Sequence, residues 1–407
     1  MEFMGIINTT PDSFHPASRV SGTEQALELA KRHVEEGATI LDIGGESSRP
    51  GAEPVTPEEE CKRVIPVIKA LRQTYPDIKL SVDTYHAYTA EQAILAGADI
   101  INDISAMTFD PDMVNVLKKY QKTVILMHIN GTPDHMQDNP TYQDVVKEVY
   151  DFLDERICFA EANGIHDIII DLGIGFGKTK EHNLTLLHNL DAFAPLHRPM
   201  LLAVSRKSCL DHSLEQTVAW SLEAARHGVA MARVHDVAPN KKAVDDWTAR
   251  DKNVVLAFGS NVGDRRASVE AGIRALSALG TVGKVSALIE TNPYGVTDQP
   301  DFLNGALLLK TKLTPQALLP ALKQIETEVG RTPTRRWGPR VLDLDIIYYE
   351  DLVLQTEPLT IPHVDRCNRS FVLNPIAEIA PDLVDPQLHK TVKELQQELQ
   401  QKIDKVC

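Results

Sequence analysis

The feature that most constrains the fold is an alternation of short apolar runs with longer, helix-like segments over the first 250 residues. The runs are FMGIIN, TILDIG, LSVDT, IINDIS, TVILMH, IIIDLG, LLAVS and MARVHD, eight in all. The segments between them, such as TEQALELAKRHVEEGA, repeat their apolar residues with the period of an amphipathic helix. This alternation predicts right-handed crossovers and a parallel sheet, and eight such units are typical of a (β/α)8 TIM barrel. An open, doubly wound sheet is the alternative.

Nearly every apolar run ends in a polar residue. These residues are Asn8, Asp42, Asp83, Asn102 with Asp103, His128, Asp171, Ser205 to Lys207, and Arg233 with His235. In a barrel the carboxyl ends of all strands meet on one face, where catalytic residues gather. A single polar residue at a strand end could equally be a cap of the following helix. Eight strand ends with carboxylates, amides and cations favour a binding site instead. The mixture fits a polar heterocycle that carries a phosphate.

Composition excludes several classes of protein. The 407 residues carry a net charge of −15, which argues against general nucleic-acid binding. The sequence has no long uncharged apolar run of the kind that predicts a membrane span. The first residues read as a strand rather than a targeting segment. The five cysteines are scattered and lack CxxC spacing, so neither a disulfide framework nor a zinc site is indicated. We therefore expect a cytoplasmic protein of two or three domains.

Two glycine-rich stretches follow predicted strands. DIGGESSRPGAEP, residues 42–54, holds Ser48 and Arg49 and suits an anion. DLGIGFGKT, residues 171–179, resembles a Walker A loop but fails its spacing. That pattern needs a glycine five residues before Gly177, and Leu172 stands there. A phosphate in this region is therefore held by another geometry.

The period changes after residues 236–252, which we interpret as the last barrel helix with a short linker. Residues 253–349 read as strand, helix, two strands, helix and strand: NVVLAFGSN, RRASVEAGIRALSAL, VGKVSALIET, FLNGALLLKT, PQALLPALKQIETEVG and VLDLDIIYY. This βαββαβ order predicts an α+β ferredoxin-like domain. An RNA-binding domain shares the order, but the strands lack its aromatic pair and the charge is acidic.

The last of these strands contains two aspartates, two residues apart. Asp343 and Asp345 point to one face, while Leu342, Leu344 and Ile346 point to the core. Two adjacent carboxylates repel each other, and Mg²⁺ shared with substrate phosphates is their natural partner. Positive charge beside them comes from Arg331, Arg335, Arg336 and Arg340. Metal and arginines together predict a polyphosphate clamp; a charged strand edge is the alternative.

The first 250 residues resemble dihydropteroate synthase in MGIINTTPDSF, DIGGESSRPGAEPVTPEEE, SVDT, INDIS, DLGIGFGKT, SRKS and RVHDV. That family condenses 6-hydroxymethyl-7,8-dihydropterin pyrophosphate with p-aminobenzoate. The resemblance implies that Asp83, Asn102, Asp171, Lys207 and Arg233 bind the pterin, with Lys207 and Arg233 catalytic. It further implies pyrophosphate binding by Asn8, Arg49 and His235, with Asn8 acting through Mg²⁺, and a p-aminobenzoate pocket formed by Phe14, Ser48, Pro50, Phe176 and Lys207.

Residues 253–385 resemble 6-hydroxymethyl-7,8-dihydropterin pyrophosphokinase in AFGSNVGDR, ETNPYGVTDQPDFLNGALLL, RRWGPRVLDLDI and IPHVDRCNRSFVLNPIAEIAPD. That family transfers diphosphate from ATP to the pterin with two Mg²⁺ ions. The resemblance implies Asp343 and Asp345 as metal ligands and Arg331 and Arg340 as catalytic arginines. It implies pterin binding by Thr291, Gly295, Phe302, Asn304 and Phe371, and ATP binding by Glu326, Arg336, Trp337, His363 and Arg369.

The two resemblances imply a bifunctional folate-biosynthesis enzyme, with a synthase domain at 1–250 and a kinase domain at 253–407. We expect small-molecule substrates and consider a homodimer formed through the barrel. Two features depart from the synthase family: the first substrate loop reads SFHPASRVSG, and Ala203 replaces a usual glycine. Two alternatives therefore stay open, a methyltetrahydrofolate-binding methyltransferase and a degenerate barrel that only binds pterin. The amphipathic segment KTVKELQQELQQKI, residues 390–403, has no assigned role.

Overall fold

The computed structural model describes residues 1–9, 22–47, 54–295, 297–332 and 338–404. The chain divides into two compact units, Met1–Asp245 and Asp246–Cys407. The sequence-based boundaries, 1–250 and 253–407, stay a prediction.

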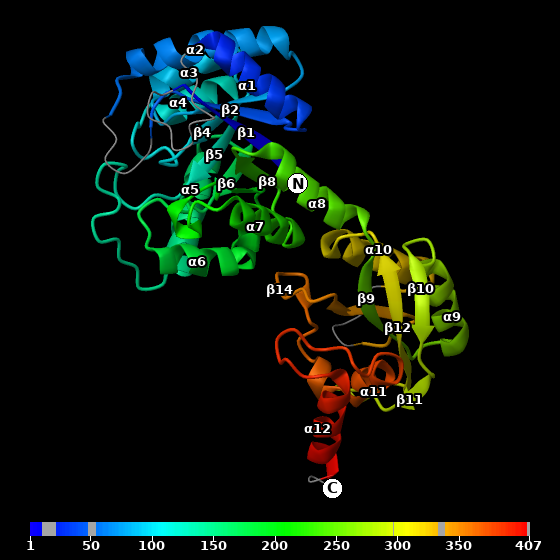
Figure 1. The fold of residues 1–407 in the computed structure, drawn as a ribbon. Coiled ribbons are helices and arrows are strands. Elements are labelled where there is room, and N and C mark those ends of the chain that lie inside the picture. The colour runs from blue at the N-terminus through cyan, green and yellow to red at the C-terminus, as the bar shows by residue number, and fades with distance from the viewer. Residues whose placement is uncertain (10–21, 48–53, 296, 333–337, 405–407) are drawn as a thin grey trace. The chain divides into compact units, whose positions relative to one another are not determined.

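The first unit is a closed parallel barrel (Figure 1). Its strands are β1 (Glu2–Asn8), β2 (Ile40–Gly44), β3 (Lys79–Asp83), β4 (Ile100–Asp103), β5 (Thr123–Met127), β6 (Ile168–Asp171), β7 (Met200–Leu202) and β8 (Met231–Val234). They pair in chain order, and β1 pairs with β8 to close the ring. The TIM-barrel prediction is confirmed, and the open sheet is excluded.

Helices follow the strands as the period of the sequence predicts. They are α1 (Thr23–Glu35), α2 (Pro57–Thr74), α3 (Ala87–Ala96), α4 (Met113–Tyr120), α5 (Val145–Ala162), α6 (Lys180–His188), α7 (Leu214–Arg226) and α8 (Val237–Ala249), with short 3-10 turns η2 (Leu190–Leu196) and η3 (Ser208–Leu210). Local signals fix their starts: Thr56 accepts a hydrogen bond from the Glu59 amide, and Pro57 occupies the first turn of α2. Within the described residues, every helix is too short or too polar to cross a membrane.

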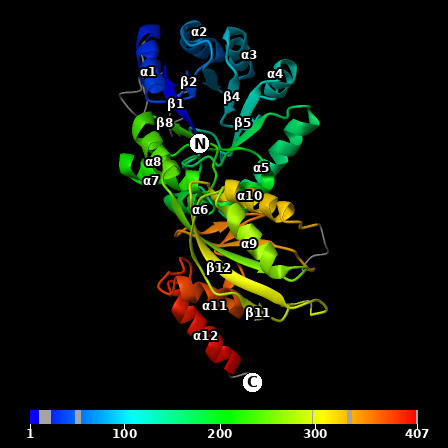
Figure 2. The same cartoon turned by 90° about the vertical axis from the view of Figure 1, so that its right-hand side faces the viewer.

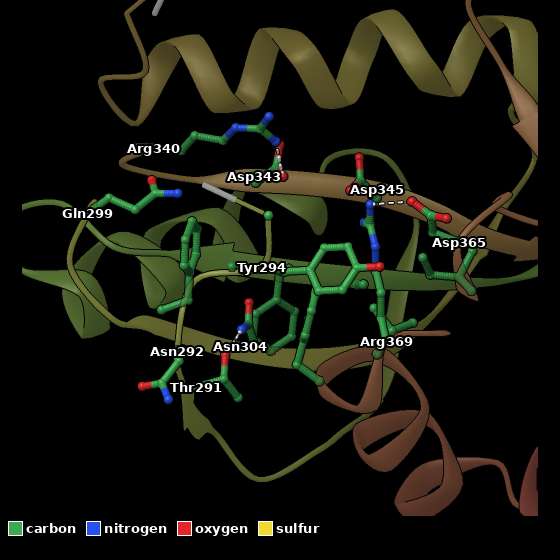
Figure 3. Close-up of a pocket in the computed structure, with 18 of the residues that line it drawn as sticks. Thr291, Asn292, Tyr294, Gln299, Asn304, Arg340, Asp343, Asp345, Asp365 and Arg369 are labelled. Atoms are coloured by element: carbon green, nitrogen blue, oxygen red, sulfur yellow. Dashed lines mark hydrogen bonds and ion pairs between the residues drawn. The ribbon is translucent and has the colours of Figure 1, made fainter. Parts of the chain in front are cut away.

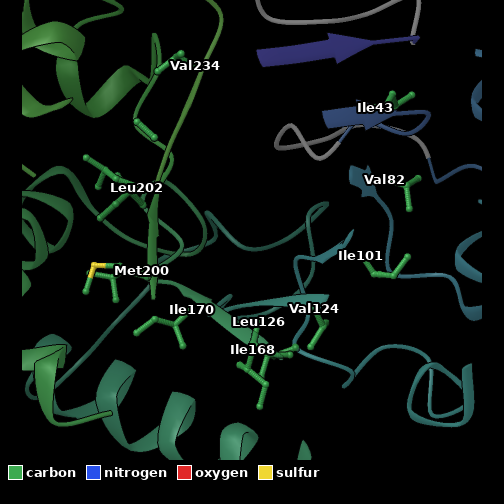
Figure 4. Packing of buried hydrophobic residues seen from close by; sticks show 14 of the residues in the cluster. Ile43, Val82, Ile101, Val124, Leu126, Ile168, Ile170, Met200, Leu202 and Val234 are labelled. Atoms are coloured by element: carbon green, nitrogen blue, oxygen red, sulfur yellow. The ribbon is translucent and has the colours of Figure 1, made fainter. Parts of the chain in front are cut away.

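The barrel has an inner and an outer apolar layer. The inner cluster comprises Met4, Ile40, Ile100, Ile125, Ile169, Leu201 and Met231. Residues of the opposite parity, such as Ile43, Val82 and Ile101, belong to the outer cluster that the helices cover (Figure 4). Because side chains alternate along a strand, the residue two positions after each inner apolar residue also faces inward. This rule places Asp42, Asn102, Asp171 and Arg233 above the inner layer, on the side where the strands end.

The second unit is built on an antiparallel sheet whose strands lie in the order β10-β12-β9-β13 (Figure 2). Its elements are β9 (Lys252–Ser260), α9 (Arg265–Leu276), β10 (Thr281–Val285), β11 (Ile289–Thr291), β12 (Phe302–Thr311), α10 (Pro315–Glu328) and β13 (Asp343–Tyr349). Helices α9 and α10 contact each other and strands β9 and β13. The βαββαβ order and the ferredoxin-like sheet are as predicted.

One predicted strand is wrong in its continuity. Residues 282–291 were expected as a single strand, but they form β10 and β11 with a break between them. At the break, the Ser286 hydroxyl accepts a hydrogen bond from the Ala306 amide and donates to the Ala287 carbonyl. The Ala287 amide then donates to the Glu378 carboxylate instead of the sheet. Side chains thus take over backbone bonds, and the register shifts.

The C-terminal segment completes the second unit. It contains β14 (Leu354–Gln355), β15 (Thr360–Ile361), η4 (Arg366–Asn368), α11 (Ser370–Ile379) and α12 (Val392–Asp404). Helix α12 packs on α11 and buries Val392 and Leu395 in a cluster with residues of β13. The segment without an assigned role is therefore part of this unit's core.

Candidate functional sites

A pocket of about 490 Å³ opens at the carboxyl ends of the barrel strands. Its lining includes Asn8, Glu46, Asp83, Phe176, Lys178, Ala203, Ser205, Arg206, Lys207, Arg233 and His235. The inward parity of the strands explains why these residues meet, although they are spread over more than 200 positions of the chain. Six predicted site residues share this pocket: Asn8, Asp83, Phe176, Lys207, Arg233 and His235.

Arg233 links Asp83, which lines the pocket, to the buried Asp42. Its Nε donates to Asp42 Oδ2 over 2.6 Å, and its Nη2 donates to Asp83 Oδ2 over 2.7 Å. Asn102 Nδ2 donates to the same oxygen of Asp42 over 3.4 Å. Burial raises the pKa of Asp83 to about 7, because Arg233 only partly offsets burial and the nearby Asp42 carboxylate adds to it. The arrangement holds acceptor oxygens where N–H donors of a heterocycle can reach them.

Lys207 lines the same pocket. Its Nζ donates to the Ile174 carbonyl and lies 4.7 Å from the centre of the Phe176 ring. Burial lowers the pKa of Lys207 to about 8, against the attraction of Asp171. Burial also raises the pKa of Asp171, whose Oδ1 accepts from the Gly173 amide. A cation, a carboxylate and an aromatic ring therefore lie together.

His235 and Ser205 form a polar edge of the pocket. The His235 amide donates to Ser205 Oγ over 3.1 Å, and His235 Nδ1 lies 2.9 Å from the same oxygen. Asn8 lines the pocket at the end of β1. Four predicted residues, Phe14, Ser48, Arg49 and Pro50, lie outside the described residues.

A second pocket, of about 300 Å³, lies on the sheet of the C-terminal unit (Figure 3). Its lining includes Phe258, Thr291, Tyr294, Gly295, Gln299, Phe302, Asn304, Arg340, Asp343, Asp345, Asp365, Arg369 and Phe371. All five residues predicted to bind the kinase pterin are among them. Asn304 Nδ2 donates to Thr291 Oγ1 over 2.7 Å, which fixes the amide against the floor of the pocket.

Asp343 is held by two arginines. Arg340 Nη1 donates to Asp343 Oδ2, and Arg331 Nη1 donates to Asp343 Oδ1 over 2.8 Å. Arg331 also pairs with Glu326, whose other oxygen accepts from the Leu344 amide over 2.7 Å. Burial opposes ionisation of Asp343, but Arg340, Lys323 and Arg331 outweigh it and hold its pKa below the usual range. Glu326 is 1% exposed, and its carboxylate holds Arg331 next to Leu344 of β13.

Asp345 has a different environment. Lys323 Nζ lies 3.9 Å from its carboxylate, and 35% of its side chain is exposed. Burial by the surrounding protein and repulsion from Asp343 raise the pKa of Asp345 to about 6. A cation between the two carboxylates would relieve that repulsion. Two neighbouring carboxylates suit Mg²⁺, which shares its coordination with phosphates and water. The described residues contain no cluster of three His, Cys, Asp or Glu ligands.

The rim of this pocket carries a cation and aromatic rings. Arg369 pairs with Asp365 over 2.8 Å and lies 5.3 Å from the centre of the Tyr294 ring. Tyr294 and Phe371 have ring centres 5.9 Å apart. His363 is held by a backbone hydrogen bond from its amide to the Ile347 carbonyl, and burial lowers its pKa. Arg336 and Trp337, both predicted to bind ATP, lie outside the described residues.

The family of pterin binding enzymes matches residues 4–235, which contain the first pocket. The chain belongs to this family. Residues 255–381 match the 7,8-dihydro-6-hydroxymethylpterin-pyrophosphokinase (HPPK) family, so the second pocket lies in an HPPK domain.

Relatives of the pterin binding unit agree with this assignment. The dihydropteroate synthase of Synechocystis sp. is 44% identical over 245 residues, which is 58% of this chain and 84% of the relative. That of Haemophilus influenzae is 40% identical over 258 residues, covering 61% and 93%. A solved Yersinia pestis dihydropteroate synthase with a sulfonamide drug complex has a TM-score of 0.58 at 38% identity, covering 60% and 92%. A Xanthomonas albilineans structure with 4-aminobenzoic acid gives 0.56 at 41%, covering 61% and 92%.

Sequence reasoning missed several residues of this pterin binding enzyme. Asp42 was recognised as a strand end but not as the partner of Arg233, although its parity with Ile40 indicates that it faces inward. Asn102 and Asp171 are buried, at 4% and 3% exposure, and are not among the residues that line the pocket. Tyr294 and Asp365 of the HPPK domain carry no pattern that the sequence alone could have distinguished from surface residues.

Proposed function

We propose that this bifunctional enzyme of folate biosynthesis uses its two pockets for consecutive steps. The HPPK domain transfers diphosphate from ATP to 6-hydroxymethyl-7,8-dihydropterin and releases AMP. The pterin binding unit condenses that product with p-aminobenzoate to 7,8-dihydropteroate and releases pyrophosphate. One observation carries the proposal: each family match lies over a pocket, and the product of one family is the substrate of the other.

In the kinase pocket, the aromatic side chains Phe302 and Phe371 suit a flat pterin ring, and Asn304 and Thr291 offer polar groups for its edge. Arg340 and Arg331 direct positive charge to the place where the phosphates react. Asp343 and Asp345 would hold Mg²⁺, which neutralises negative charge on phosphate oxygens when bound. The pterin hydroxyl oxygen forms a bond to the β-phosphorus and loses its proton to water, the bond from the β-phosphorus to the oxygen it shares with the α-phosphorus breaks, and AMP leaves with that oxygen.

In the barrel, Asp83, Asn102 and Asp171 recognise the N–H groups of the pterin, with Asp42 holding Arg233 in place. His235 and Arg233 receive the pyrophosphate, and Asn8 would supply an oxygen ligand for Mg²⁺. The C–O bond to pyrophosphate breaks, the amine nitrogen of p-aminobenzoate bonds to the pterin methylene, and that nitrogen loses a proton. Lys207, with Phe176 beside it, orients both substrates.

The degenerate scaffold is disfavoured, because six of the predicted ligands line the pocket and the relatives named above are dihydropteroate synthases. A cytoplasmic location and a homodimer through the barrel stay predictions. The relatives named above are synthases rather than methyltransferases.

The proposal is tested on the full chain in two assays. With 6-hydroxymethyl-7,8-dihydropterin, ATP and Mg²⁺, we expect AMP and the pterin pyrophosphate. With the pterin pyrophosphate and radiolabelled p-aminobenzoate, we expect labelled dihydropteroate. Tight pterin pyrophosphate binding without labelled product would contradict the synthase assignment and support a scaffold.

A further inference from the structure

Lys178, in the stretch that resembles a Walker A loop, is buried rather than free to hold a phosphate. It is 2% exposed. Its Nζ lies 2.9 Å from His128 Nδ1, 2.9 Å from the Gly173 carbonyl, 3.0 Å from the Phe176 carbonyl and 3.3 Å from the His128 carbonyl. An ammonium group has three N–H bonds, and these protein acceptors use all of them.

Electrostatics show that this burial is costly. Burial lowers the pKa of Lys178 well below its usual value. Burial and the neighbouring ammonium lower the pKa of His128 to about 2, so the imidazole is neutral and its Nδ1 can accept. A buried cation among neutral acceptors stabilises a fold less than a well-packed apolar chain would. The burial of Lys178 therefore indicates a role in positioning the loop rather than in stabilising the fold.

The loop that Lys178 holds lies very close to the loop after β5. A methyl group on Gly173 would lie 1.8 Å from the His128 carbonyl oxygen, and one on Gly177 would lie 2.3 Å from the Asn130 carbonyl oxygen. Both glycines have positive φ, which permits this approach. Tyr142 adds a hydrogen bond from its hydroxyl to the Gly177 carbonyl over 2.9 Å.

This loop supplies two groups that contact Lys207. The Ile174 carbonyl accepts from Lys207 Nζ, and the Phe176 ring lies 4.7 Å from it. Lys178 binds the carbonyls on both sides of these groups, those of Gly173 and Phe176. Lys178 has no described hydrogen bond with Asp83 or Arg233, and among the groups assigned to the pterin the loop meets Asp171 through the Gly173 amide. Displacement of the loop would therefore alter the side of the pocket formed by Phe176 and Lys207 more than the side formed by Asp83 and Arg233.

We propose that Lys178 is a positioning residue for the p-aminobenzoate subsite, which it shapes through Phe176 and through the Ile174 contact with Lys207. The inference rests on the proposed synthase function. It gives the glycine-rich stretch a role that involves no phosphate: the lysine fastens the loop from inside, and the ring it places faces the aromatic amine.

The test is steady-state kinetics of dihydropteroate formation by the full chain carrying Lys178→Met. We expect the KM for p-aminobenzoate to rise about tenfold or more, the scale of a small misplacement of a binding group, with the KM for pterin pyrophosphate within about threefold. In a Phe176→Ala background, Lys178→Met should add little, because the two residues act as a unit. Lys147→Met, an exposed lysine on α5, is the matched control and should change neither constant.

Equal changes in both constants, or losses that multiply in the double variant, would overturn the proposal. If Lys178→Met fails to fold, Tyr142→Phe loosens the same loop from the surface and should raise the KM for p-aminobenzoate alone by a smaller factor; no change there would also overturn it. Wild-type chain that forms no dihydropteroate would refute the proposed function instead, so the two failures are distinguishable.

Discussion

Arg340 donates a hydrogen bond to the carboxylate of Asp343, three residues further along the chain. The same carboxylate is a predicted metal ligand, and Arg331 pairs with its other oxygen. The phosphates of ATP would compete with Asp343 for both arginines, and the Asp343 carboxylate would then be free to bind a cation. The ion pairs therefore place the arginines beside the reacting phosphates before the substrate arrives.

Arg340→Ala should lower turnover about 100-fold or more and change the affinity for free pterin by less than about threefold. An arginine that meets charge developing on the transferred group acts mainly in the transition state. Single-turnover AMP formation measures the chemical step. Arg265→Ala, which breaks the Arg265–Glu290 pair in the same unit, is the control. An unchanged chemical step with weaker pterin binding would sink this role for Arg340.

Ala203→Gly should leave synthase activity intact and tighten pterin pyrophosphate binding. Ala203 is the inward residue above Leu201 and lines the pocket, where its methyl occupies space that glycine would free. Overpacking by one methyl typically costs about 1–3 kcal/mol. Calorimetry with pterin pyrophosphate measures the change. Weaker binding in the variant would show that the methyl supports the pocket rather than crowding it.

Asp385→Ala should destabilise the C-terminal unit by about 3–5 kcal/mol, the usual cost of removing one partner of a buried ion pair. Arg366 binds both oxygens of Asp385, and Tyr348 donates to one of them over 3.1 Å. Urea unfolding of the full chain measures the loss. Asp382→Ala, at an exposed site nearby, should cost little. A loss below about 1 kcal/mol for Asp385→Ala would contradict the pairing.

His227 should stabilise the barrel less as the pH rises. Burial opposes its charge, but hydrogen bonds with Asp191 and Glu223 prevail and raise the pKa of His227 to about 9. Its contribution is therefore fully present below about pH 6.5 and is lost as the pH rises through about 9. We expect the free energy of unfolding of wild type to exceed that of His227→Gln at pH 6, with a much smaller gap at pH 9.5. A gap independent of pH would contradict the charged histidine; His166→Gln, at an exposed position, is the control.

The fold was largely predictable because it rests on local periodicity. Apolar runs, helix periods and strand-end residues are all readable within short windows, and the shared face of Asp343 and Asp345 follows from their alternation with Leu342, Leu344 and Ile346. The break after β10 was not predictable, because the Ala287 amide bonds to Glu378, 91 residues further along the chain. The same holds for Arg233 and Asp42, which are 191 residues apart.

The lining of the two pockets was predictable in part, but its connections were not. Resemblance named several residues that line the pockets, such as Asp83 and Asn304. It could not tell that Asp343 is held by two arginines or that Lys178 is bound by His128 and by backbone carbonyls. Those facts depend on distances between loops, which no spacing in the sequence encodes. Glu326 illustrates the point. The resemblance implies a role near ATP, but in the structure its carboxylate accepts hydrogen bonds from Arg331 and from the Leu344 amide of β13.

The most direct test of consecutive chemistry is dihydropteroate formation from 6-hydroxymethyl-7,8-dihydropterin, ATP, Mg²⁺ and p-aminobenzoate, measured for wild type, Asp345→Asn and Lys207→Ala. We expect wild type to form dihydropteroate. Asp345→Asn should form it only when pterin pyrophosphate is supplied, whereas Lys207→Ala should make AMP but lose about 100-fold or more of dihydropteroate formation. A mixture of the two variants should restore product. Dihydropteroate formation by Asp345→Asn at the wild-type rate from ATP, or by Lys207→Ala within a few-fold of wild type, would contradict the account.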